Sequence, residues 1–268
     1  MQIVFWSCMP GHAAVSSSML SLACSCGAYQ RYNTAVLQLQ YKKNNIQYPF
    51  FKISDKENVE QFNSAGMDAL IRTAKGGSIG GGAETTAISF FDKKVSVIPQ
   101  STNTDGTAYY TSLYQTLPLI FKSLDSAFDI SFIDTTAGND PLTMEALKLA
   151  DVIVVCLPQE EWILNYFFSK YDLKHSKIFY LFGNYDQKSN RNIGTLLKNR
   201  KYRGKLNSKN TAFVEHDIDY ANALNSSDLV TFFQSGILSK KNPNHEFFAS
   251  VHDATRKLLT FAGVVPRK

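Results

Sequence analysis

Near the middle of the chain stands the segment Asp129-Ile130-Ser131-Phe132-Ile133-Asp134-Thr135-Thr136-Ala137-Gly138. Its apolar run predicts a buried strand over 130–134 that ends in an acid and small residues. A helical pattern follows at 142–150, and a continuous apolar run at 152–157 predicts a second buried strand. A strand, a helix and a strand in this order indicate a parallel crossover. The segment therefore predicts an α/β fold with a mostly parallel central sheet and helices on both faces.

The same alternation extends in both directions from this segment. Further strands are expected at 3–6, 35–39, 95–99, 177–182 and 212–214. Further helices are expected at 16–29, 59–73, 111–128, 161–171, 217–234 and 244–259, and a glycine-rich loop at 76–82. Because no long linker or internal repeat interrupts the pattern, we expect a single domain over residues 1–268.

Composition excludes several classes of protein. Of the 268 residues, 44% are hydrophobic and 19% charged, which supplies a real core and argues against disorder. No apolar run approaches the ~18 residues needed to cross a bilayer. The first six residues carry no charged leader and no long apolar stretch, so they do not resemble a secretory signal. A cytoplasmic protein is expected.

Positive charge is concentrated in one segment. Residues 174–209 hold ten Lys or Arg residues and one acid, Asp186, so this segment carries +9 and the rest of the chain −4 of the net +5. Such a segment suits nucleic acid, an anionic membrane surface or phosphates. A solvated helix and loop would show the same pattern, and both interpretations stay open.

The first candidate site follows the strand at 3–6. In open parallel sheets, ligands bind beyond the carboxyl ends of the strands. Here the loop 7–15 leads into a helix that begins Ser16-Ser17-Ser18, and a helix start attracts anions. A complete phosphate loop reads G-x-x-x-x-G-K-[ST]. Val15 stands in place of the lysine and Ala14 in place of the glycine before it, so a serine-rich helix cap explains the loop equally well.

The second candidate site is the end of the strand at 130–134. Asp134 suits a Walker B-like site, where a carboxylate holds water on Mg²⁺. The Gly138 N–H would then lie near a γ-phosphate. A turn or helix-capping aspartate is the alternative.

These elements stand in the order found in the MinD/ParA group of deviant P-loop ATPases, which the chain resembles over nearly its whole length. Asp134-Thr135-Thr136-Ala137-Gly138 resembles the group's D-[ST]-P-[AP]-G, and Ala150-Asp151-Val152-Ile153-Val154-Val155 its A-D-x-x-[IV]-V strand. Phe182-Gly183-Asn184-Tyr185-Asp186 is similar to the x-x-N-[RK]-x element, whose Asn reads adenine. Asp219-Tyr220-Ala221-Asn222-Ala223-Leu224 is similar to the segment beside the base.

The resemblance implies a P-loop NTPase fold that binds ATP and Mg²⁺. The nucleotide-binding residues that it implies are Gly11, His12, Ala13, Ala14, Val15, Ser16, Ser17, Asp134, Gly138, Asn184 and Tyr185. Mg²⁺ would be held by Ser16 and, through water, by Asp134.

Three departures from the family pattern bear on catalysis. Pro10 stands where dimerising members carry a signature lysine, Val15 replaces the phosphate-binding lysine, and the second strand ends in Gln40 rather than a catalytic aspartate. One oxyanion-stabilising donor contributes ~2.7–4 kcal/mol in other enzymes. We therefore expect a degenerate ATPase that binds ATP with weak or absent hydrolysis and has no clear catalytic residue.

Within the group, the chain is most similar to the atypical TadZ/CpaE-like proteins of Tad (Flp) pilus loci. Those proteins often carry an N-terminal receiver-like domain, whereas no separate receiver-like domain is expected here, because the sequence starts directly at the first ATPase strand. This implies a dimeric localisation factor for Tad secretion and pilus assembly components, acting at a cell pole or membrane periphery with at most peripheral membrane association. One alternative is an active ParA-type plasmid or chromosome partitioning ATPase that binds DNA nonspecifically through 174–209. A nucleotide-free scaffold is the other.

Overall fold

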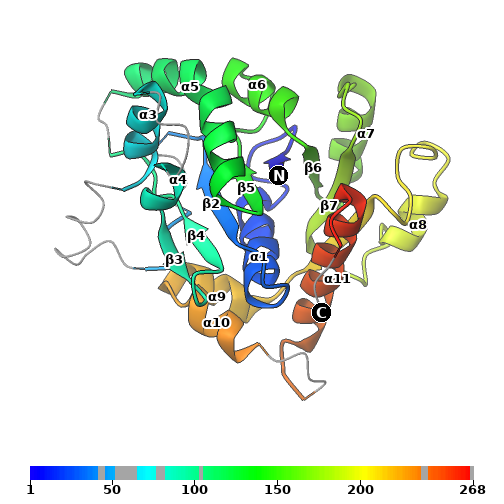
Figure 1. The fold of residues 1–268 in the computed structure, drawn as a ribbon. Helices are drawn as coiled ribbons and strands as arrows, with labels where there is room; N and C mark the ends of the chain where they lie inside the picture. The colour runs from blue at the N-terminus through cyan, green and yellow to red at the C-terminus, as the bar shows by residue number, and fades with distance from the viewer. Residues whose placement is uncertain (42–45, 52–64, 77–81, 103–104, 237–240, 266–268) are drawn as a thin grey trace.

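The computed structural model describes residues 1–41, 46–51, 65–76, 82–102, 105–236 and 241–265 (Figure 1). These residues form an eight-stranded sheet in the order β3-β4-β2-β5-β1-β6-β7-β8. The strands are β1 Gln2–Trp6, β2 Thr34–Gln38, β3 Ile88–Phe90, β4 Val95–Val97, β5 Ile130–Asp134, β6 Val152–Leu157, β7 Ile178–Tyr185 and β8 Thr211–Glu215. Among the strand pairs of the described residues, only β3–β4 is antiparallel, which confirms the predicted mostly parallel sheet.

Helices cover both faces of the sheet, as predicted (Figure 1). They are α1 Val15–Ala28, α3 Met67–Lys75, α4 Gly82–Thr85, α5 Gly106–Ala127, α6 Pro141–Leu149, α7 Glu161–Lys170, α8 Ile193–Lys198, α9 Ile218–Ser226, α10 Leu229–Ser235 and α11 His245–Ala262. α3, α5, α6 and α7 share one core, and α1, α9, α10 and α11 share the other. In the part of the chain that the structure describes, no helix combines the length and apolar character needed to cross a membrane.

The central strand β1 shows why this sheet is buried on both sides. Val4 and Trp6 enter the core under α5, α6 and α7, whereas Ile3 and Phe5 enter the core under α1 and α11. Successive side chains of a strand point to opposite faces, so a continuous apolar run suits a sheet covered twice. In this register Phe5 lies beside Asp134 of β5. The loop after β1 is thereby brought next to the end of β5.

The structure extends or divides several predicted elements. β7 continues past the predicted end at 182 to Tyr185. The helix predicted over 217–234 is two helices, because Ser227 adopts a left-handed conformation (φ 62°) that ends α9. The short strand β3 and the short helix α8 were not predicted from sequence.

Two predicted segments are only partly described. Of the helix expected over 59–73, residues 59–64 lie outside the described residues, and α3 begins at Met67. Of the glycine-rich loop expected over 76–82, residues 77–81 lie outside them, and Gly82 begins α4.

Candidate functional site

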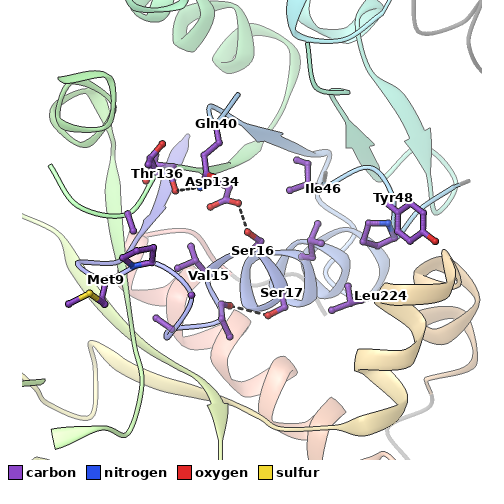
Figure 2. Close-up of a pocket in the computed structure, with 18 of the residues that line it drawn as sticks. Met9, Val15, Ser16, Ser17, Gln40, Ile46, Tyr48, Asp134, Thr136 and Leu224 are labelled. Atoms are coloured by element: carbon purple, nitrogen blue, oxygen red, sulfur yellow. Dashed lines mark hydrogen bonds between the residues drawn. The ribbon is translucent and has the colours of Figure 1, made fainter. Parts of the chain in front are cut away.

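A cavity of about 880 Å³ opens at the carboxyl ends of β1, β2 and β5 and runs along the first turns of α1 (Figure 2). This is the edge of a parallel sheet at which ligands bind. It is lined by Met9, Pro10, Gly11, Ala13, Ala14, Val15, Ser16, Ser17, Leu20, Gln40, Ile46, Tyr48, Pro49, Asp134, Thr135, Thr136, Ala137, Leu224 and Asn225.

The loop before α1 presents an open helix start to this cavity. Ala14 is the residue before the helix, lies in the left-handed region (φ 48°, ψ 41°) and supplies no side-chain cap. The first helical hydrogen bond is donated by Ser18 N–H to Ala14 O at 2.9 Å. The N–H groups of Val15, Ser16 and Ser17 therefore have no acceptor within the helix and add to the positive end of its dipole. Such a helix start binds an anionic group.

Backbone strain accompanies this loop. A left-handed conformation costs a non-glycine residue about 1–2 kcal/mol, and Ala14 adopts it where a complete phosphate loop has glycine. Gly11 also has a positive φ of 80°, which only glycine adopts readily. Both glycine positions of the complete motif are substituted, by Met9 and Ala14, and Gly11 is the loop's remaining glycine.

Gly183 of β7 packs closely against the loop before α1. A Cβ at this position would lie 2.6 Å from Ser18 Oγ and 2.8 Å from Ala13 O. Real Cβ atoms do not approach backbone oxygen this closely, so the loop must move if a side chain is added.

We expect Gly183→Ala to lower the free energy of unfolding by about 1–3 kcal/mol, the usual effect of overpacking. Chemical denaturation would measure the loss. Gly76→Ala is the matched control, because its Cβ would meet nothing nearer than 3.5 Å (Arg72 O). Equal stability of the two variants would contradict the close contact.

Asp134 and Ser16 meet across the cavity, although 118 residues separate them. Ser16 Oγ donates to Asp134 Oδ2 at 2.6 Å (Figure 2). Asp134 ends β5 and is fully buried, whereas Ser16 lies in the first turn of α1. The structure thus joins the two candidate sites, at the start of α1 and at the end of β5, into one.

Burial removes the Asp134 carboxyl from water, and its hydrogen bonds within the described residues do not fully replace that hydration. Desolvation raises its pKa to about 7, against the lowering effects of the Ser16 hydroxyl and the nearby Thr135 N–H. The second oxygen, Oδ1, has no hydrogen-bond partner among the described residues. Gln38, paired with Asp134 in the neighbouring strand, is also buried, and its side-chain amide has no partner there either.

These groups fit a hydrated Mg²⁺. A hard divalent cation takes oxygen ligands and keeps several of its waters. A serine hydroxyl and a carboxylate with one unpartnered oxygen offer such ligands directly or through water. Ser16 and Asp134 are therefore the residues that would hold the ion, as the resemblance implies.

The described residues that line the cavity lack the positively charged side chains that are usual at a phosphate site. Among the described lining residues there is no Lys, Arg or His, and Asp134 is the only acid. Gln40, two residues after the end of β2, donates from Nε2 to Thr135 O at 2.9 Å. The wall contributed by the described residues offers backbone N–H groups, hydroxyls and amides, but no cation, to a bound anion.

Two predicted site residues, one in the loop before α1 and one after β5, do not line the cavity. His12 is exposed, with its ring against Trp162 and its Nδ1 3.4 Å from Glu160 Oε2. The Gly138 N–H donates to Ser7 O at 3.0 Å, and Trp6 Nε1–H donates to Gly138 O at 2.6 Å. The Gly138 N–H is therefore already engaged.

Asn184 and Tyr185 also lie outside the cavity. Asn184 is exposed at the end of β7 with φ 47°. Tyr185 is buried, stacks on Phe213 at 4.2 Å between ring centroids, and accepts a hydrogen bond from Ile193 N–H at its hydroxyl. Their role in binding a base stays a prediction.

One wall of the cavity is formed by residues that were not predicted as site residues from the sequence. Ile46, Tyr48 and Pro49 follow β2, and Leu224 and Asn225 belong to α9. Leu224 stood inside the segment that resembles the base-binding element, but no motif marks the segment after β2. Figure 2 shows Tyr48 and Leu224 at the end of the cavity away from Met9.

Solved ParA and MinD structures share this fold. A ParA family ATPase from Chlorobium tepidum matches with a TM-score of 0.69 at 12% identity, over 95% of this chain and 98% of that one. The septum site-determining protein MinD from Pyrococcus horikoshii, complexed with Mg-ADP, matches with 0.65 at 13%, over 98% and 99%. A McdA variant from Cyanothece, in complex with ATP, matches with 0.60 at 12%, over 98% and 97%.

The chain therefore has the P-loop NTPase fold of the MinD and ParA type. No protein-family model and no curated protein sequence matches it. At these low identities the likeness concerns the fold.

Proposed function

We propose that this chain is a MinD/ParA-type protein that binds an adenine nucleotide with Mg²⁺ in the cavity and hydrolyses it weakly or not at all. The observation that carries the proposal is the Ser16–Asp134 pair, with its unpartnered Oδ1, beside the uncapped start of α1. The helix start suits phosphate oxygens, and the pair suits the cation that accompanies them. The fold shared with ATPases solved with ATP or Mg-ADP supports the same assignment.

Weak hydrolysis follows from what the cavity wall lacks. Charge that develops on a transferring phosphoryl group is normally stabilised by Lys or Arg as well as by Mg²⁺. Val15 and Pro10 occupy the positions at which the family carries lysines, and Gln40, in place of an aspartate, donates to Thr135 O. Binding without turnover suits a switch or positional marker better than an enzyme.

The resemblance to TadZ/CpaE-like proteins suggests where such a marker would act. We propose a homodimer that recruits Tad pilus or secretion components at a cell pole or membrane periphery. The same departures at Pro10, Val15 and Gln40 support this assignment.

Calorimetry with Mg-ADP and Mg-ATP tests the nucleotide-binding proposal. We expect binding by the wild type and a loss of about tenfold or more in Ser16→Ala, because the variant leaves Asp134 without the one side-chain donor that it has among the described residues. Ser126→Ala, an exposed serine of α5, should bind like the wild type. Phosphate release in the ATP samples should stay near background.

Other outcomes would support the other functions. Fast phosphate release would indicate an active ATPase. Failure of the wild type to bind either nucleotide would contradict the proposal and favour a nucleotide-free scaffold.

The basic segment 174–209 keeps the partitioning ATPase as a second candidate. Lys198, Arg200, Lys201 and Arg203 are exposed at and after α8. Other members are engaged: Arg191 pairs with Glu161, and Lys177 Nζ donates to Ala262 O at the end of α11. Duplex DNA binding that weakens steeply with salt and is lost in Lys201→Gln/Arg203→Gln would favour this function.

A further inference from the structure

A further cavity, of about 350 Å³, lies between α3 and α5, on the face of the sheet opposite to α1. Figure 1 shows these two helices side by side. The cavity is lined by Asp68, Ile71, Arg72, Lys75, Thr102, Tyr109 and Ser112, none of which lines the nucleotide cavity. Small-molecule sites have volumes of about 300 to 1,000 Å³, so this cavity suits a small ligand.

Polar residues at helical spacing face the cavity from both helices. On α3 these residues are Asp68, Arg72 and Lys75, and on α5 they are Tyr109 and Ser112. Residues three or four apart share one side of a helix, so each set forms one wall. Lys75 Nζ donates to Ser112 Oγ at 2.9 Å, which joins the two walls at an exposed position. The packing of α3 on α5 therefore gathers two cations, a hydroxyl and a phenol in one place.

The walls of this cavity carry an excess of positive charge. Arg72 is exposed and makes no hydrogen bond or ion pair with the described residues. Asp68 is the one acid among the described lining residues, and its carboxylate already accepts from Ser101 Oγ at 2.6 Å and from Thr102 N–H at 2.9 Å. Two cations, Arg72 and Lys75, against one acid leave a net charge of +1. The cavity therefore favours an anionic ligand.

Tyr109 adds a buried hydroxyl without a partner to the wall. The residue is 1% exposed, and its OH has no hydrogen-bond partner among the described residues. Burial raises the pKa of the phenol, and the charge of Asp68 adds to this effect, so the hydroxyl keeps its proton and can donate it. A buried hydroxyl normally has a partner, because leaving it unpaired destabilises the folded state. A ligand oxygen in the cavity would supply that partner.

We propose that this cavity binds a small phosphate monoester, with the phosphate between Arg72 and Lys75. The hydroxyls of Ser112 and Tyr109 are the further donors. A guanidinium, an ammonium and hydroxyls are groups that donate to phosphate oxygens, and three terminal oxygens can accept from more of them at once than the two oxygens of a carboxylate. The site shares no lining residue with the nucleotide cavity, so it does not depend on the proposed function.

Titration with glycerol 3-phosphate in the presence of EDTA tests this site, because the chelator removes the Mg²⁺ that the proposed nucleotide site uses. In the wild type we expect saturable shifts of the amide NMR signals of Arg72, Lys75 and Ser112. Arg72→Gln should raise the Kd about tenfold or more, and Tyr109→Phe about 3- to 10-fold, because they remove a charged and a neutral donor. Lys122→Gln, which removes the same charge from an exposed position of α5, should bind within about twofold of the wild type.

Denaturation of the ligand-free Tyr109→Phe variant checks the role of the hydroxyl independently. Phenylalanine keeps the ring and removes an OH that has no partner among the described residues. The denaturation midpoint should therefore equal or exceed that of the wild type. A lower midpoint would show that the hydroxyl is already satisfied in the free protein, and would overturn its assignment to a ligand.

Three results of the titration would overturn the proposal. Shifts that rise linearly with concentration, and that Arg72→Gln and Lys122→Gln reduce equally, would show only a general attraction of anions to surface charge. Tighter binding of citrate than of glycerol 3-phosphate would exclude phosphate as the recognised group. Binding of inorganic phosphate as tightly as glycerol 3-phosphate would assign the cavity to the free ion instead of an ester. None of these results bears on nucleotide binding, which is measured with Mg²⁺ present.

Discussion

At pH 8 the ligand-free Asp134→Asn variant is expected to be more stable than the wild type, and its advantage should shrink by roughly 2–3 kcal/mol as the pH falls to 5. The cause is the burial of the carboxyl, which raises its pKa from 3.8 to about 7. The folded state therefore binds this proton more tightly than the unfolded state. Asp134 contributes most to stability below its unfolded pKa, and the contribution is lost as the pH rises through about 7.

Denaturation from pH 5 to pH 8 would measure the difference between variant and wild type. Asparagine has the same size and keeps an oxygen to accept the Ser16 hydroxyl, while it replaces the charged carboxylate by a neutral amide. Asp92→Asn is the matched control, because it makes the same substitution at a carboxylate that is 86% exposed. A parallel pH profile for Asp134→Asn and the wild type would contradict a raised pKa at Asp134.

The affinity for Mg-ADP should change with pH in the direction opposite to the stability of the ligand-free protein. A cation that is bound beside Asp134 favours the ionised carboxylate, so Mg-ADP affinity should rise as the pH increases through about 7. Asp134→Asn should lose this rise and most of the Mg²⁺ dependence of binding. A gain in stability together with a loss of ligand binding would be typical of a residue that ligand binding requires although it lowers the stability of the fold.

The strongest sequence patterns identified the elements that carry the fold. β5 and β6 have the predicted bounds, because continuous apolar runs in a doubly covered sheet leave little choice of structure. β3 has three residues, none of them buried, and α8 has six residues within a basic segment. Neither of these is long enough to show a period, so only the tertiary structure reveals them.

The candidate site likewise contains residues that the sequence predicts and residues that only the folded structure brings together. The loop before α1 and Asp134 could be found because each follows a recognisable strand, and the sheet order places β1 and β5 side by side. Tyr48 and Leu224 could not be brought together from sequence, because their contact with one cavity depends on how the segment 46–51 packs against α10. The engagement of the Gly138 N–H by Ser7 O is likewise a property of the folded loop.

Val15→Lys is expected to strengthen Mg-ADP and Mg-ATP binding about 10- to 100-fold, the effect of one charge-assisted hydrogen bond to a phosphate. Val15 is the first residue of α1, lines the cavity and is only half-buried, so a longer side chain can extend into the cavity. No Lys or Arg stands among the described lining residues, so the new ammonium group would meet little competing positive charge.

Calorimetry on Val15→Lys and Val15→Gln separates charge from side-chain length. Glutamine adds a polar chain without charge and should change the affinity by less than about threefold, and the gain in the lysine variant should shrink at high salt. Phosphate release should stay slow even when the lysine variant binds tightly, because Gln40 still occupies the place of the family's catalytic aspartate. Equal affinities for the lysine and glutamine variants would show that phosphates do not lie at the start of α1. Tight binding with fast hydrolysis would instead show that the missing lysine alone had limited turnover.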